Sequence, residues 1–79
     1  MELEKEMEKA LEEDDIFKVK KFVGQCDVNT LHKLIDKVVL RMCHYQSVQS
    51  ITGNNESYLI GKNREILKIL EQELDEMFD

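Results

Sequence analysis

The sequence predicts an all-α protein: a small helical bundle built on a long antiparallel helical hairpin (about 29–50 and 57–78), preceded by two shorter helices. The chain has no proline and only three glycines, so it lacks the turn residues that a β domain needs. Apolar residues recur at spacings of three and four, which is the helical period. The clearest turn signal, TGNNE at 52–56, separates two such segments of roughly 20 residues each. A chain of 79 residues forms one helical domain over 1–79.

The first two helices are predicted from residues 2–13 and from the segment IFKVKKFV that follows. In the first, one face carries the apolar side chains of Leu3, Met7, Ala10 and Leu11. Asp14 or Asp15 caps the second helix, which is expected to stop at Gly24. Its predicted buried side is Ile16, Val19, Phe22 and Val23.

The third helix, about 29–50, is predicted to be the central one. QCDVN at 25–29 forms the connection, and Asp27 or Asn29 caps the helix. Its seam of alternating three- and four-residue spacings is Leu31, Ile35, Val38, Met42 and Tyr45. Leu34, Val39, Leu40 and Cys43 broaden this stripe, so we expect contacts from more than one side.

The fourth helix, about 57–78, begins with a cap at Asn55 or Ser57. Its predicted seam is Ile60, Asn63, Leu67, Leu70, Leu74 and Met77. Gly61 costs about 1 kcal/mol relative to alanine inside a helix, so a break near 61–63 with a new cap at Asn63 is an alternative. Asn63 is otherwise a polar contact that fixes the register of a self-complementary pairing. A wide apolar stripe on so small a chain favours a homodimer.

Catalysis is not expected, and the sequence predicts no catalytic, cofactor-binding or metal-binding residues. Cys26 and Cys43 lack the paired spacing of zinc ligands. His32, Asp36 and Cys43 share one helical face, but eleven residues separate His32 from Cys43 by about 16 Å, whereas proton transfer needs about 3 Å. Cys43 is therefore predicted to be a small buried residue, and His32 and His44 are predicted to lie at the surface. Glycine-rich phosphate loops are absent from the sequence.

Charge is distributed unevenly along the chain, whose net charge is −6. Residues 1–15 and 71–79 are strongly acidic, and the segment between them is basic. The main functional hypothesis is a protein-interaction module whose acidic, DNA-mimic-like surface binds the basic surface of a larger partner and inhibits or regulates it. The carboxylates assigned to this surface are Glu8, Glu12, Glu13, Asp14, Asp15, Glu71, Glu73, Asp75 and Glu76. The competing explanation is that these charges only keep a small protein soluble.

Two other binding functions compete with the acidic module. A helical adaptor would use an exposed apolar patch, for which the candidates are Met1, Leu3, Met7, Met77 and Phe78. A helix–turn–helix DNA-binding protein would place Asn29, Thr30, His32, Lys33 and Lys37 in a major groove. The pI near 4.9 disfavours direct nucleic-acid binding. The basic residues Lys18, Lys20, Lys21, Arg41 and Lys68 are instead expected to neutralise the acidic segments.

Cellular context follows only from what the sequence lacks. The chain shows no apolar run of the roughly 18 residues that a membrane span requires and no secretory signal, so a cytoplasmic location without membrane binding is expected. Residues 15–30 resemble one helix and loop of an ankyrin repeat, but no second copy follows. Residues 71–78 resemble a sliding-clamp-binding peptide without its leading glutamine. Neither resemblance assigns the chain to a family.

Overall fold

The computed structural model describes residues 2–53 and 56–78, and within these residues it is helical with no strand. The elements are α1 (Leu3–Glu12), α2 (Ile16–Phe22), a short 3-10 helix η1 (Val23–Gln25), α3 (Val28–Thr52) and α4 (Ser57–Met77). The all-α prediction is confirmed, and each predicted helix boundary lies close to the one observed.

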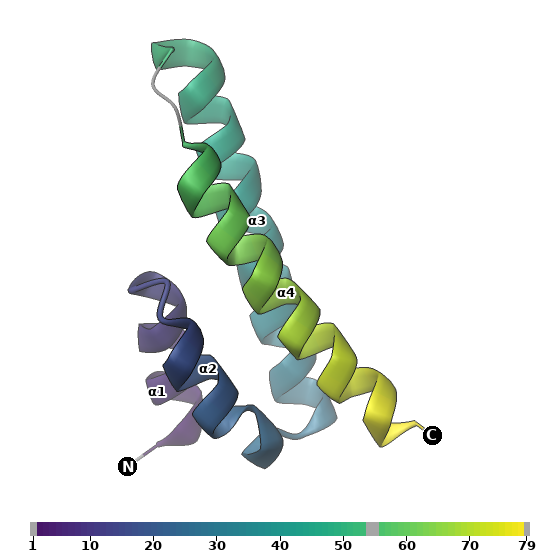
Figure 1. The fold of residues 1–79 in the computed structure, drawn as a ribbon. Helices are drawn as coiled ribbons and strands as arrows, with labels where there is room; N and C mark the ends of the chain where they lie inside the picture. Colours follow the sequence, from purple (N-terminus) through teal and green to yellow (C-terminus); the bar gives the residue numbers. More distant parts are fainter. Residues whose placement is uncertain (1, 54–55, 79) are drawn as a thin grey trace.

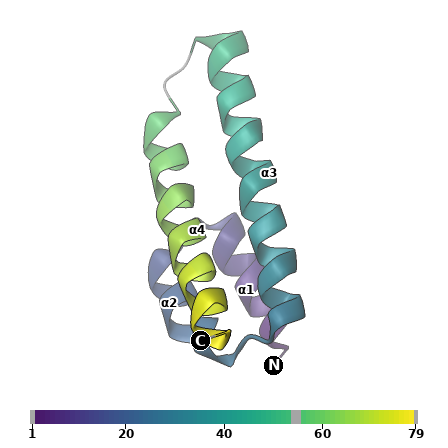
Figure 2. The same ribbon diagram turned by 90° about the vertical axis from the view of Figure 1, so that its right-hand side faces the viewer.

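The long helices α3 and α4 form the antiparallel hairpin predicted from the sequence (Figure 1). The short helices α1 and α2 form a second antiparallel pair that packs beside one half of this hairpin, α1 against α3 and α2 against α4. Figure 2 shows that the other half of the hairpin projects beyond this pair, and that α1 begins and α4 ends at the opposite end of the molecule from the hairpin tip. The molecule measures 40 × 28 × 18 Å.

The corner between α1 and α2 depends on two adjacent aspartates. Asp14 has a φ of 53°, in the left-handed region that asparagine and aspartate tolerate better than other side chains. Asp15 is the N-cap of α2, and its side chain accepts a hydrogen bond of 3.1 Å from the backbone N–H of Lys18. Asp15 is therefore the cap, whereas Asp14 makes the turn.

The end of α2 differs from the prediction. The chain does not stop at Gly24 in a left-handed conformation but tightens into η1 through Gln25. This extension buries Val23 and Cys26 against the hairpin. Asp27 then caps α3, accepting a 2.7 Å hydrogen bond from the backbone N–H of Thr30.

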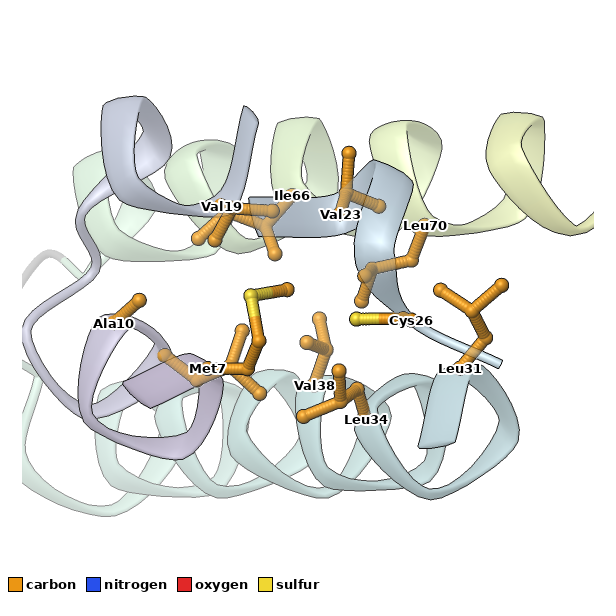
Figure 3. Close-up of a cluster of buried hydrophobic side chains, with 11 residues drawn as sticks. Met7, Ala10, Val19, Val23, Cys26, Leu31, Leu34, Val38, Ile66 and Leu70 are labelled. Atoms are coloured by element: carbon orange, nitrogen blue, oxygen red, sulfur yellow. The ribbon is translucent and has the colours of Figure 1, made fainter. Parts of the chain in front are cut away.

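One hydrophobic core lies where the two helical pairs meet (Figure 3). Met7 of α1 points into the centre of the cluster, with Leu34 and Val38 of α3 on one side and Val19 of α2 and Ile66 of α4 on the other. The buried members are Met7, Ala10, Leu11, Val19, Val23, Cys26, Leu31, Leu34, Val38, Ile66 and Leu70. At about 0.8 kcal/mol per buried CH₂, burial of these side chains is the main stabilising contribution to the bundle.

The hairpin turn begins with Gly53, whose φ of 75° needs a residue without a side chain. The backbone N–H of Glu56 donates a 3.0 Å hydrogen bond to Gln49 Oε1, which ties the start of α4 to α3. Glu56 holds the N-cap position, and Ser57 is already helical, so the prediction of a cap at Ser57 is wrong. The alternative cap, Asn55, lies outside the described residues.

Two predictions about the long helices are corrected by the packing. Helix α4 runs through Gly61 without a break, and Asn63 is fully buried inside it rather than capping a new helix. In α3, Val39, Leu40 and Cys43 are exposed, so only Leu34 broadens the buried stripe. The reason is that α1 and α4 both lie on the side of α3 that carries Leu34 and Val38. The outer face of α3 has no neighbour within the described chain.

The buried stripe of α4 also differs from the predicted seam. Ile66, which the seam omitted, is fully buried, and Leu67 and Leu74 are half-buried. Met77 is 38% exposed. Because α2 packs on α4 beside α3, the buried face turns toward Ile66 and away from the side that a simple two-helix hairpin would cover.

Candidate functional site

Two of the four carboxylates of α1 pair with basic residues of α3. Glu4 lies 3.6 Å from the Lys33 ammonium, and Glu8 pairs with Lys37. One turn further, the Arg41 guanidinium donates a 3.2 Å hydrogen bond to the carbonyl oxygen of Glu12. Lys33, Lys37 and Arg41 are spaced by four residues and form one ridge along α3. The predicted pairing of Arg41 with the acidic N-terminal segment is thus seen within one chain.

Asp14 is buried at 8% exposure and contacts both helices of the hairpin. Asn63 Nδ2 of α4 donates a 2.8 Å hydrogen bond to Asp14 Oδ1. From α3, the hydroxyl of Tyr45 donates to Asp14 Oδ2 at 3.5 Å, and the Arg41 guanidinium lies 3.6 Å from Oδ1. Asp14 therefore does not belong to an outward acidic surface, and it anchors the α1–α2 corner on the hairpin.

The other predicted carboxylates near this corner have different environments. Asp15 is occupied as the cap of α2, and Glu13 lies 3.7 Å from the Lys18 ammonium. The Glu12 side chain is exposed, and among the described residues no cation lies within 4 Å of it. Of the five predicted residues in this part of the chain, Glu12 is thus the one whose carboxylate is both exposed and unpaired.

The carboxylates of α4 form a contrasting cluster, which we call the α4 acidic end: Glu71, Glu73, Asp75 and Glu76. Glu73 is half-buried and the other three are exposed. Within residues 2–53 and 56–78, none of the four forms an ion pair, and the last turn of α4 carries no basic residue. The C-terminal end of a helix carries partial negative charge, so the last turn, which holds Asp75 and Glu76, is electrostatically unfavourable for carboxylates. Four of the nine predicted binding residues are thereby brought together at one end of the molecule.

The candidates for chemistry do not assemble into a site. His32, Asp36 and Cys43 are all exposed on α3, so the prediction that Cys43 is buried is wrong, and the prediction that His32 lies at the surface is confirmed. Cys26 is buried at 3% exposure, and burial raises the pKa of its thiol above the usual range, with smaller contributions from Asp27 and Glu73. A raised thiol pKa lowers nucleophilicity at neutral pH. The described residues contain no group of three His, Cys, Asp or Glu side chains placed to hold a metal ion.

The helix–turn–helix arrangement is not favoured by the packing of α3. Lys33 and Lys37, which were to contact phosphates or bases, are engaged by Glu4 and Glu8 of α1. DNA phosphates would therefore have to displace Glu4 and Glu8 in order to pair with these two lysines.

The predicted apolar patch is divided by the fold. Met7 is fully buried and Leu3 is half-buried, while Met1 lies outside the described residues. Phe78 is 72% exposed at the end of α4. A second apolar surface, which the sequence analysis missed, lies on the projecting half of the hairpin, where Ile51 is 84% and Tyr58 is 71% exposed. Its signal in the sequence is the scarcity of charge: residues 42–61 contain Glu56 as their only Asp, Glu, Lys or Arg.

No helix in the described part of the chain is long and apolar enough to cross a membrane. Comparison with known proteins returned no matching family model, curated protein or solved structure.

Proposed function

We propose that this chain is a non-enzymatic protein-interaction module that binds the basic surface of a partner through the α4 acidic end, and that it acts as a homodimer. The observation that carries this proposal is the α4 acidic end itself. Two of its four carboxylates, Asp75 and Glu76, occupy the last turn of a helix, which disfavours them, and none of the four forms an ion pair within 4 Å among the described residues. A cationic surface supplied by another molecule would relieve this unfavourable arrangement.

Solubility alone explains the α4 acidic end less well. Charges that only prevent aggregation serve equally well at positions where they stabilise the fold, such as the first turn of a helix. The carboxylates of α1 show that arrangement, because Glu4 and Glu8 form ion pairs across the bundle. Asp75 and Glu76, in the last turn of α4, instead each cost on the order of 0.3–1 kcal/mol at low ionic strength.

The charge density supports a partner that ordinarily binds nucleic acid. Residues 71 to 76 advance by about 7.5 Å along the helix axis and carry four negative charges. Duplex DNA carries one negative charge per about 1.7 Å of its axis. The α4 acidic end of one chain would therefore offer a basic groove a charge density comparable to that of a short duplex, and occupying the groove would inhibit the partner.

A helical adaptor that binds another helix is the second candidate function. The exposed apolar side chains of Ile51 and Tyr58 favour it, since such residues on an uncharged surface are typical of helix-in-groove contacts. Binding through that surface would respond weakly to salt, whereas binding through the α4 acidic end would weaken steeply as salt rises.

The experiment compares two variants that remove the same charge. The test variant carries Glu71→Gln, Glu73→Gln, Asp75→Asn and Glu76→Gln. The matched control carries Glu2→Gln, Glu4→Gln, Glu8→Gln and Glu13→Gln, all at carboxylates that pair within the chain. Each protein is immobilised and used to capture partners from a lysate of the source cells at increasing NaCl.

We expect the wild type and the control to capture the same partner, releasing it with rising salt, and the test variant to lose it. Equal capture by both variants would show that the α4 acidic end is not the binding surface. Binding of the wild type to duplex DNA at about 0.15 M salt would contradict the proposal directly, because a DNA mimic repels DNA.

A further inference from the structure

The hairpin face that α1 and α2 cover does not end where these helices end. On α3, the residues in contact with α1 follow the ridge Lys33, Lys37 and Arg41. This ridge continues to Tyr45, four residues further on, and then at spacings of three through Val48 to Ile51. Figure 1 shows this part of α3 extending past the α1–α2 corner. Tyr45 and Val48 are half-buried, and Ile51 is 84% exposed.

The face of α4 continues in the same way. Asn63, which donates its hydrogen bond to Asp14, marks the level of the α1–α2 corner. Beyond it, Leu59 is half-buried and Tyr58 is 71% exposed, with the Lys62 ammonium 5.0 Å from the Tyr58 ring centroid. We call the part of the hairpin beyond the corner, residues 42–52 of α3 and 57–61 of α4, the arm.

The arm differs from the rest of the molecule in charge. The chain has 11 Lys and Arg and 17 Asp and Glu residues, yet Glu56 is the only one of them within residues 42–61. The polar residues there are uncharged, chiefly Gln and Ser. A chain of net charge −6 repels a second copy of itself over most of its surface, and this repulsion is smallest at the arm.

We propose that the arm is the self-association surface of this protein: the arms of two copies pack face to face and form a four-helix bundle. A second copy suits this surface because the other half of the same hairpin face is already covered by an antiparallel helical pair, α1 and α2. A second arm is also an antiparallel helical pair, and its length matches the uncovered length by symmetry. Isologous pairing brings Ile51 and Tyr58 of each copy out of water, and the Lys62 ammonium that lies over the Tyr58 ring is the charge that this pairing must accommodate.

The size of the arm sets the expected strength of this contact. From residue 42 to residue 52, α3 advances by about 15 Å along its axis, and two helices side by side are about 20 Å wide. This footprint, about 300 Å², is well below the roughly 800 Å² per partner of a standard interface. We therefore expect a dimer that dissociates on dilution, with a dissociation constant between about 10 µM and 1 mM.

The test uses substitutions whose charge suits the local helix. Ile51→Lys places a cation in the last turn of α3, and Tyr58→Glu places an anion in the first turn of α4; both favour the helix dipole, so the monomer stays folded. The matched control is Phe78→Glu, because Phe78 is 72% exposed and lies at the far end of α4. Association is measured by sedimentation equilibrium up to about 2 mM protein, and folding by circular dichroism.

The expected result is a dimer for the wild type and Phe78→Glu, and at least tenfold weaker association for each arm variant at unchanged helicity. A wild type that stays monomeric throughout this range, or a dimer that all three substitutions affect equally, would overturn the proposal.

A second readout locates the interface on α3. Cys43 precedes Val48 by five residues and so points about 140° away from it around the helix. Cys43 is exposed and Cys26 is buried, so a thiol reagent reports on Cys43. Its alkylation rate should be the same at low and high protein concentration. Protection of Cys43 in the dimer would show that the outer face of α3, rather than the face of the arm that carries Tyr45, Val48 and Ile51, forms the interface.

This inference rests on the homodimer in the proposed function but not on the α4 acidic end. The variant with four neutral residues at the α4 acidic end should still dimerise, while the arm variants should still respond to a basic partner as monomers. A negative result in the association experiment therefore does not contradict binding through the α4 acidic end. A negative result in the capture experiment likewise does not contradict self-association through the arm.

Discussion

A single side chain, Asp14, joins three parts of the fold. Its backbone makes the α1–α2 corner, and its carboxylate accepts hydrogen bonds from Asn63 on α4 and Tyr45 on α3. Burial of a carboxylate in this way is tolerated because the Arg41 guanidinium lies 3.6 Å away. The role of Asn63 follows from the same contact: it orients the α1–α2 corner within one chain.

Substitution of Asp14 tests whether this network stabilises the fold. Asp14→Ala removes the acceptor of the Asn63 and Tyr45 hydrogen bonds and the partner of Arg41, and places alanine at a φ of 53°. We expect a loss of about 3 kcal/mol in the free energy of unfolding, measured by urea denaturation. Asp14→Asn keeps an acceptor for Asn63 and tolerates the same backbone conformation, so it should cost about half as much. Equal losses in both variants would show that neither the acceptor nor the backbone conformation matters.

The sequence predicted that an aspartate would lie at the α1–α2 corner, but it did not predict that Asp14 would be buried there. Capping depends on residues within one turn, so the sequence alone limits the N-cap of α2 to Asp14 or Asp15. The partner that buries Asp14, Asn63, lies 49 positions away. Sequence pattern carries no information about such a contact, and for this reason Asp14 was assigned to the outward acidic surface.

Among whole elements, the helices themselves followed from local rules. Asp15 and Asp27 fix the starts of α2 and α3, and Gly53 fixes the end of α3, so these boundaries could be predicted closely. The errors lie where packing overrides local preference. Gly61 disfavours a helix by about 1 kcal/mol, yet α4 passes through it because Ile60 and Asn63 are buried on either side.

Gly61 is therefore a site where alanine should stabilise the protein. A Cβ added there meets no atom within 4 Å, and the residue is exposed in the middle of a helix. Gly61→Ala should raise the free energy of unfolding by about 0.5–1 kcal/mol, measured by urea denaturation. Gly53→Ala is the matched control, and it should lower the value because Gly53 has a φ of 75°. An unchanged or lower stability of Gly61→Ala would mean that α4 is interrupted at this position.

Across the whole molecule, the charge layout was predicted in part. An acidic segment on each side of a basic middle was visible in the sequence, and the basic ridge of α3 does pair with Glu4 and Glu8 of the first acidic segment. Nothing in the sequence distinguishes the first acidic segment from the second. Their difference arises from the arrangement of helices, because α1 lies against the ridge of α3 whereas the last turns of α4 extend beyond it.

This asymmetry predicts opposite effects on stability from the two neutralised variants. Removing the four charges of the α4 acidic end relieves the helix dipole and mutual repulsion, so the free energy of unfolding should rise by about 1–3 kcal/mol at low ionic strength. The matched variant at Glu2, Glu4, Glu8 and Glu13 loses surface ion pairs, so its stability should fall by up to about 1 kcal/mol.

Urea denaturation in the absence of added salt and at about 1 M NaCl measures both effects, and high salt should shrink each of them because it screens charges beyond about 3 Å. If the α4 variant is no more stable than the wild type, the α4 acidic end is not electrostatically strained, and the argument that its charges serve binding rather than solubility fails. If it is more stable and also loses its partner, the chain retains these carboxylates against its own stability, as binding surfaces do when they are complete only in a complex.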